Sequence, residues 1–284
     1  MAQLIQMRQR IKAIETIKKI TQAMRLIAMS THSRLKTKDE SLKEYNTEIT
    51  KLLQTIKDVV PDWQHPILTP KSEDQNTLII LIGSQKGLCG NFNTTLFHFF
   101  QDYLAQHKFL NYDAIAVGKR AIDYMHKQQA ANIIGSYQEL SSTTTSSIAY
   151  QIIQTILAAQ KPYSKVYVFS NYVKTFFTQR PQIVSLIPFV AYTSAPHAES
   201  ANFDEHIWEQ KPQEVLDLLA QQCLEANLQY LLFQSLLAEH AARFISMDNS
   251  TRNAQNLLEA TQLDYNKLRQ AKITKELAEL VGSF

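Results

Sequence analysis

The sequence predicts an α/β protein in which a long antiparallel coiled coil of N- and C-terminal helices brackets a central, doubly wound, Rossmann-like domain. Three observations predict this fold: two long stretches without glycine or proline, a seven-residue apolar repeat in both, and a middle segment of alternating strand and helix patterns. On these grounds the chain divides into an N-terminal helix at 1–60, an α/β domain at 61–211 and a C-terminal helix at 212–284.

The two terminal stretches are predicted to be uninterrupted helices. Residues 1–60 and 213–281 contain neither glycine nor proline, and all eight prolines lie between Pro61 and Pro212. Glycine and proline are the residues that end helices, so their absence permits runs of roughly 90 and 100 Å at about 1.5 Å per residue. Helices of this length need a partner for their apolar faces, and the two termini are each other's obvious partner.

Apolar residues in both stretches recur every seven positions, which is the pattern of a left-handed coiled coil. The N-terminal seam is expected at Met7, Ile14, Thr21, Ala28, Leu35, Leu42, Ile49 and Ile56, with Ile17, Met24, Tyr45 and Leu52 between them. The C-terminal seam is expected at Leu216, Cys223, Tyr230, Leu237, Phe244, Thr251, Leu258 and Tyr265, with Leu219, Phe233, Met247, Ala254 and Leu268 between them. Polar interruptions such as Thr21 and His240 are expected to fix the register between the helices.

The middle segment alternates short apolar runs with helical patterns, which indicates a small doubly wound sheet. Strands are expected at 77–83, 113–117, 132–134, 165–170 and 183–189. Helices are expected at 93–107, 119–127 and 143–159.

Composition and charge limit the classes of function. The longest aliphatic run, Leu78 to Ile82, is far too short to cross a bilayer, so any membrane association is expected to be peripheral. The two cysteines, Cys89 and Cys223, form no Cys-x-x-Cys motif and are expected to be reduced thiols. Residues 1–38 carry a net charge of +8 and the remainder −5, so the first helix is expected to meet an acidic protein surface or nucleic acid.

The loop after the first predicted strand is the strongest candidate for a phosphate site, but its residues do not fit that chemistry. A P-loop needs Lys followed by Ser or Thr after its last glycine, whereas here Lys86 precedes Gly87 and Leu88 follows it. We therefore interpret the loop from Lys86 to Gly90 as a tight strand-to-helix turn.

Two further features could carry chemistry. Cys89 lies at a helix start and could be a nucleophile, although no histidine is marked out as its base. Glu239-His240 lacks the second histidine of a zincin motif, so a packed histidine is the better interpretation. The sequence thus predicts no catalytic residue, metal site or cofactor site.

The termini resemble the gamma subunit of F-type ATP synthase. The N-terminal match comprises Arg10-Ile11-Lys12-Ala13-Ile14 and Ile17-Lys18-Lys19-Ile20-Thr21-Gln22-Ala23-Met24. The C-terminal match comprises Glu239-His240-Ala241-Ala242-Arg243, Met247, Asn249, Asn253-Ala254, Asn256-Leu257, Tyr265-Asn266-Lys267, Arg269-Gln270-Ala271, Ile273-Thr274 and Glu276-Leu277. In the middle, Lys86-Gly87-Leu88-Cys89-Gly90 resembles the glycine-cysteine loop of that family, and Gln179-Arg180-Pro181 with Leu186-Ile187-Pro188 resembles its later strand. Departures at Gln85, Asn91, Arg252, Gln255 and Thr31-His32-Ser33 identify a divergent member.

The resemblance implies a non-catalytic rotor subunit that couples ion-driven rotation to ATP synthesis or hydrolysis. Its expected partners are the alpha and beta subunits of a ring, the epsilon subunit and the c-ring of the membrane sector, on the cytoplasmic face of a bacterial inner membrane. Ring contacts are expected at Met24, Arg243, Arg269, Gln270 and Thr274.

Two alternatives from other classes stay open. One is a nucleic-acid-binding coiled coil that uses the basic helix, although no aromatic-basic interleaving supports it. The other is a small α/β enzyme that uses Cys89. Neither explains the long paired helices.

Overall fold

The computed structural model describes residues 2–60, 63, 65, 76–107, 112–128, 132–159, 162–189 and 211–281. Two long helices are its main elements: α1 spans Ala2–Val59 and α5 spans Pro212–Val281. The chain forms two compact units, a terminal unit of Met1–Ser30 with Arg243–Phe284 and a central unit of Thr31–Ala242. Both helices contribute to both units, and the predicted unbroken helices are confirmed.

The central unit contains a five-stranded mixed sheet in the order β3-β2-β1-β4-β5. Its strands are β1 (Thr77–Ile82), β2 (Asp113–Val117), β3 (Asn132–Tyr137), β4 (Lys165–Thr175) and β5 (Thr178–Ile187). The first four are parallel, and β5 runs antiparallel to β4. Each predicted strand exists, but β4 and β5 extend beyond the predicted bounds into one long hairpin, with Phe176 and Phe177 at its turn.

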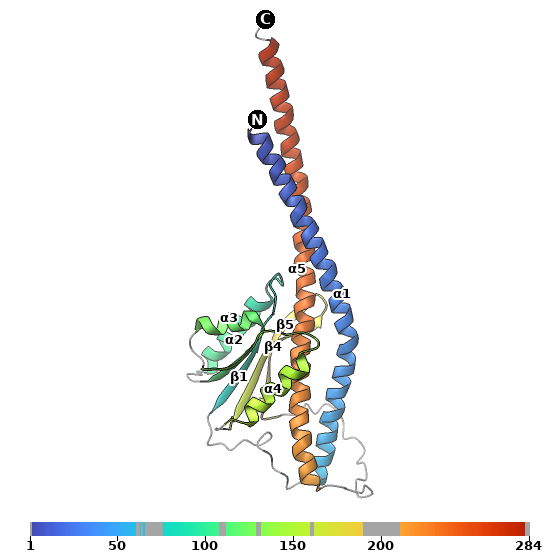
Figure 1. Cartoon of the computed structure of the whole chain (residues 1–284), viewed down its shortest axis with the longest axis vertical. Coiled ribbons are helices and arrows are strands. Elements are labelled where there is room, and N and C mark those ends of the chain that lie inside the picture. Colours follow the sequence, from blue (N-terminus) through green and yellow to red (C-terminus); the bar gives the residue numbers. More distant parts are fainter. Residues whose placement is uncertain are drawn as a thin grey trace. The chain divides into compact units, whose positions relative to one another are not determined.

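Helices cover both faces of this sheet, as a doubly wound domain requires. The connecting helices are α2 (Phe92–His107), α3 (Lys119–Gln128) and α4 (Thr145–Leu157). Leu96, Phe100 and Met125 from α2 and α3 pack with Ile79 and Leu81 on one face. On the other face, Leu78, Ile80 and Ile82 join α4 and the central-unit parts of α1 and α5 in the largest core cluster. Figure 1 shows α2 and α3 on one side of the sheet and α4 on the other. Strand β1 is therefore buried on both sides, which explains its continuous apolar run.

The predicted seam of α5 is largely confirmed, whereas half of the seam predicted for α1 is wrong. Ile14, Leu35, Ile49 and Ile56 are buried as expected. The predicted intervening positions Ile17, Tyr45 and Leu52 are exposed, at 54%, 53% and 43%, and on α5 Leu268 is exposed as well. Instead the second buried row lies three residues before the first, at His32, Asp39 and Leu53, with Asn46 partly buried. Hydrophobicity alone could not find this row because most of its members are polar.

These polar residues pair across the helices. In the central unit, the Gln234 side-chain amide donates to Asp39, and the Asn46 amide donates to Asn227 at 3.2 Å. In the terminal unit, the Thr251 hydroxyl donates to the Thr21 hydroxyl at 3.0 Å. A slip by one heptad would separate such pairs, so they favour a single register.

Candidate functional site

The loop between β1 and α2 is filled by its own side chains. The backbone N–H of Ser84 donates to Asn93 Oδ1 at 3.0 Å, and Asn93 Nδ2 donates back to Ser84 Oγ at 2.8 Å. Asn93 Nδ2 also contacts Cys89 Sγ at 3.4 Å, and Ser84 Oγ donates to the Lys86 carbonyl at 2.9 Å. Lys86, Gly87, Cys89 and Gly90 therefore belong to one internally bonded turn.

Glu239 of α5 anchors this loop. Its side chain is only 3% exposed, and its Oε2 accepts a hydrogen bond from the backbone N–H of Gln85 at 3.2 Å. Neither the incomplete metal motif nor the C-terminal match that contains Glu239 indicates this anchoring role. Within the described part of the chain, no three His, Cys, Asp or Glu side chains gather as a metal ion would need.

This arrangement disfavours phosphate binding at the loop. A phosphate cradle uses the free N–H groups at the end of a strand, but those of Ser84 and Gln85 already bind Asn93 and Glu239. A carboxylate at the same place would also repel an anion. The loop thus joins α5 to the sheet.

Cys89 is not placed as an exposed nucleophile would be. Its side chain is 3% exposed and packs with Phe92, Ala238 and Ala242. The next residue back, Leu88, is 58% exposed and adopts a positive φ of 65°. A leucine in the left-handed region costs about 1–2 kcal/mol, so the surrounding bonds must hold the turn in this shape.

In the terminal unit, α1 and α5 pack through a small apolar cluster with polar pairs beside it. Ile14, Ala254 and Leu258 are buried together, with Ile11 packed against them. Asp248 accepts a hydrogen bond from Arg25 Nη1 at 2.6 Å, and Arg252 Nη2 lies 2.7 Å from its other oxygen. The hydrogen bond from Arg25, followed by the charges of the two arginines, lowers the pKa of Asp248. Tyr265 accepts a hydrogen bond from Arg8 Nε at 2.8 Å.

The five residues expected to make outside contacts are not gathered at one place. Arg243 is only 5% exposed and Met24 is partly buried. Arg269, Gln270 and Thr274 are exposed near the end of α5, where the Thr274 hydroxyl donates to the Gln270 carbonyl at 3.0 Å. Arg243 and Arg269 are 26 positions apart on one helix, so they are separated by roughly 40 Å.

Exposed apolar side chains on both helices of the terminal unit are a signal that the sequence analysis missed. On α1 they include Ile17, Ile20, Leu26, Ile27 and Met29, each at least 45% exposed. On α5 they include Leu263, Leu268, Ile273, Leu277 and Val281, each at least 37% exposed. Apolar surface of this extent indicates a protein-protein interface.

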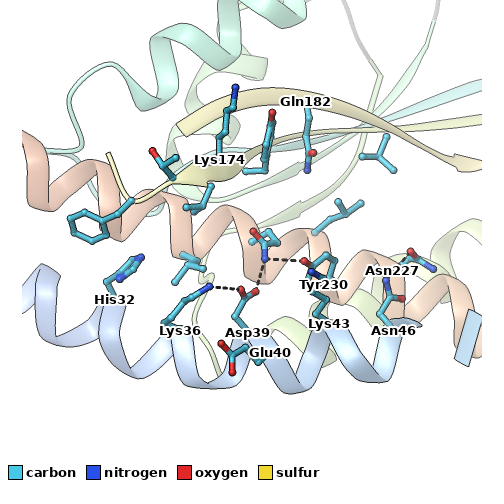
Figure 2. Close-up of a pocket in the computed structure, with 18 residues that line it drawn as sticks. His32, Lys36, Asp39, Glu40, Lys43, Asn46, Lys174, Gln182, Asn227 and Tyr230 are labelled. Atoms are coloured by element: carbon cyan, nitrogen blue, oxygen red, sulfur yellow. Dashed lines mark hydrogen bonds and ion pairs between the residues drawn. The ribbon is translucent and has the colours of Figure 1, made fainter. Parts of the chain in front are cut away.

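The central unit also contains a polar pocket between α1, α5 and the β4–β5 hairpin (Figure 2). Lys36, Asp39 and Lys43 of α1 line it together with Tyr230 of α5, and the Gln234 side chain bonds to both Asp39 and Tyr230. His32 of α1 lines it beside Phe176 of the hairpin. The seven-residue spacing of His32, Asp39 and Asn46 is the sequence signal that could have located it.

Together, the two long paired helices, the α/β domain anchored to α5 and the exposed apolar side chains of the terminal unit define a helical protein with a surface suited to other proteins. Comparison with known proteins then assigns the family: residues 3–284 match the family model described as ATP synthase, and the chain belongs to the ATP synthase gamma-chain family. It is 31% identical to the ATP synthase gamma chain of Chlorobium phaeobacteroides, over 97% of this chain and 95% of that one. It is also 31% identical to the gamma chain of Christiangramia forsetii, over 99% and 98% of the two chains.

A solved structure has the same fold at much lower sequence identity. The chain from the Euglena gracilis mitochondrial ATP synthase, in a structure of OSCP, F1 and c-ring in rotational state 3, superposes with a TM-score of 0.69. The two chains are 16% identical, and the match covers 99% of this chain and 93% of that one. The resemblance inferred from the terminal motifs is therefore confirmed.

Proposed function

We propose that this chain is the central-stalk rotor subunit of an F-type ATP synthase, coupling ion-driven rotation to ATP synthesis or hydrolysis in a ring of alpha and beta subunits. The observation that carries the proposal is the exposed apolar surface on both helices of the terminal unit, in a chain that matches gamma chains over nearly its whole length. An isolated helix pair would gain nothing from leaving such side chains in water, whereas a ring that encloses the pair would bury them.

The coupling follows from the asymmetry of a two-helix shaft. Two helices of unequal length cannot present the same surface to three chemically identical beta subunits, so each subunit is held in a different state. Rotation of the shaft exchanges those states in sequence. The apolar side chains suit this task because they make few directional bonds and so resist rotation only weakly.

Polar contacts to the ring are assigned to exposed residues at the end of α5. Arg269, Gln270 and Thr274 are exposed, which supports a contact with beta subunits. Met24 is partly buried and suits the bearing surface, whereas the burial of Arg243 favours a role in holding the shaft together. The basic face of α1 would lie against acidic ring loops.

The α/β domain would then lie toward the epsilon subunit and the c-ring. None of the described helices has the length and apolar content that a membrane crossing requires. Attachment to the cytoplasmic face of a bacterial inner membrane would therefore be peripheral, through these partners. Catalysis would belong to the ring; in this chain the Ser84 and Gln85 amides, at the end of β1, already bind Asn93 and Glu239.

Purification of the tagged chain from gently extracted membranes tests the proposal. Alpha and beta subunits identified by mass spectrometry, together with ATPase activity, are the expected result. A chain that purifies alone would contradict the proposal. A chain that purifies with nucleic acid, and loses it steeply as the salt concentration rises, would contradict the proposal and favour the basic coiled-coil alternative. ATP turnover by the chain alone would contradict a non-catalytic role.

A further inference from the structure

The pocket between α1, α5 and the β4–β5 hairpin has a volume of about 680 Å³. Pockets of roughly 300–1,000 Å³ are the usual size for small-molecule sites in proteins. All the residues that line it belong to the central unit. The function proposed above makes no use of it.

His32 is a buried polar residue of this pocket that has an atom without a hydrogen-bond partner. The side chain is 8% exposed, and its ring packs edge-on against Phe176 of the hairpin at 4.8 Å between centroids. Its Nε2 atom is buried without a hydrogen-bond partner. Buried polar atoms are nearly always paired in native proteins, so an unpaired one at a pocket wall indicates a missing partner.

The pocket lining offers hydrogen-bond donors beside acceptors, one of which, Asn46 Oδ1, is buried without a partner. The Asp39 carboxylate already binds the Gln234 amide and lies 3.6 Å from Lys36 Nζ. The Tyr230 hydroxyl accepts a hydrogen bond from Gln234 at 3.1 Å, which leaves its own hydrogen to donate. Lys36 and Lys43 line the same space (Figure 2).

The formal charge of the lining is positive. Lys36, Lys43 and Lys174 outnumber Asp39 and Glu40, with His32 counted as neutral. Burial and the charge of Lys36 lower the pKa of His32 against the opposing effect of Asp39, so the ring is neutral at pH 7 and can still donate one hydrogen bond.

Apolar side chains complete the lining. Val173 and Val184 of the hairpin and Leu231 and Leu237 of α5 border the pocket beside the polar groups. An inorganic anion would leave these side chains without a partner. A ligand that satisfies both kinds of wall has an anionic group and a hydrocarbon body.

We propose that this pocket binds a small organic carboxylate, with the carboxylate bonded to His32 and Lys36 and an apolar body against the hairpin and α5. Such a ligand would join α1, α5 and the hairpin at one point. It would therefore stabilise the central unit by RT ln(1 + L/Kd), where L is the free ligand concentration.

Binding of three small probes to the full chain tests this proposal. The probes are 2-naphthoate, its neutral amide 2-naphthamide, and inorganic phosphate, measured by isothermal titration calorimetry at constant ionic strength. We expect 2-naphthoate to bind more tightly than either of the others, because only it carries both the charge and the apolar body. Lys36→Met should weaken its binding by about tenfold, the usual effect of losing one charge-assisted hydrogen bond.

Lys38→Met is the matched control, because Lys38 is exposed on the same helix and does not line the pocket. It should leave naphthoate binding unchanged. The Lys36 side chain is 59% exposed, so both variants should unfold at the temperature of the unchanged chain. Equal binding of 2-naphthamide or phosphate, failure of all three probes to bind, or equal effects of the two substitutions would overturn the proposal.

Discussion

Replacement of Gly118 by alanine tests how tightly β1 and β2 are joined beside the loop that Glu239 anchors. Gly118 follows β2 with a φ of +87°, and an added Cβ would lie 2.3 Å from the carbonyl oxygen of Gly83. The atoms nearest to this Cβ all belong to the backbone, so the clash cannot be relieved by a side chain that moves aside. The structure therefore predicts that Gly118→Ala destabilises the central unit strongly.

The magnitude follows from two contributions. The left-handed conformation costs a non-glycine residue about 1–2 kcal/mol. Relief of the clash would strain the hydrogen bonds from Gly83 N–H to Val117 O (2.9 Å) and from Gly118 N–H to Tyr137 O (2.7 Å), each worth about 1 kcal/mol. We expect a loss of about 3 kcal/mol, or a fall in Tm of roughly 6–12 °C for a unit of this size.

Gly87→Ala is the matched control for this experiment. Its added Cβ would meet only the tip of the Arg120 side chain, at 3.2 Å, and Arg120 can swing away. We expect a change within about 0.5 kcal/mol, as for most surface substitutions. Thermal unfolding of the full chain, followed by circular dichroism, compares the two variants. Equal midpoints would refute the argument from the backbone clash.

Three further predictions concern the terminal unit. Ile14→Ala should destabilise it by about 2 kcal/mol and Ile17→Ala by less than about 0.5 kcal/mol, because only Ile14 is buried. Amide hydrogen exchange on α1 measures both effects. Equal loss of protection in the two variants would mean that Ile17 packs in the seam, as the sequence predicted. Leu258→Pro should break α5 at a cost of about 3 kcal/mol or more. Membranes that carry this variant should lose ATP-driven proton pumping. Normal pumping would show that an unbroken α5 is not needed for coupling. The pKa of Asp248 is lowered in the folded chain, so its contribution to stability is complete above the unfolded value of about 3.9 and is lost as pH falls through the folded value. Asp248→Asn should reduce the loss of unfolding free energy at acid pH, measured by urea unfolding as a function of pH. An unchanged pH dependence would mean that other carboxylates cause this loss.

The sequence was sufficient for the long helices and the positions of the strands because their signals are local. Missing glycine and proline marked α1 and α5, and the run at Leu78 marked a strand buried on both faces. The second seam of α1 could not be predicted in this way. Ile17 is apolar but exposed, while Asp39 is charged but buried. The burial of each side chain depends on what lies opposite it, such as Gln234 of α5 for Asp39, and the sequence of α1 does not contain that information.

The candidate site shows the same limit. The motif analysis located the loop and the exposed end of α5, but it could not show that Glu239 binds the Gln85 amide, since 154 positions separate them. The pocket at His32 was missed for the same reason, because its walls come from three distant segments.

The polar pairs between α1 and α5 also matter while the chain is being made. At about 5–20 residues per second, the ribosome needs roughly ten to thirty seconds after completing α1 before α5 begins to emerge. During that time the apolar row of α1 has no intramolecular partner and can pair with another nascent chain. Asp39 disfavours such pairing, because a second copy of α1 would not supply the amide of Gln234 that binds its carboxylate. The buried polar row thus protects an unfinished chain from its neighbours until its own second helix arrives.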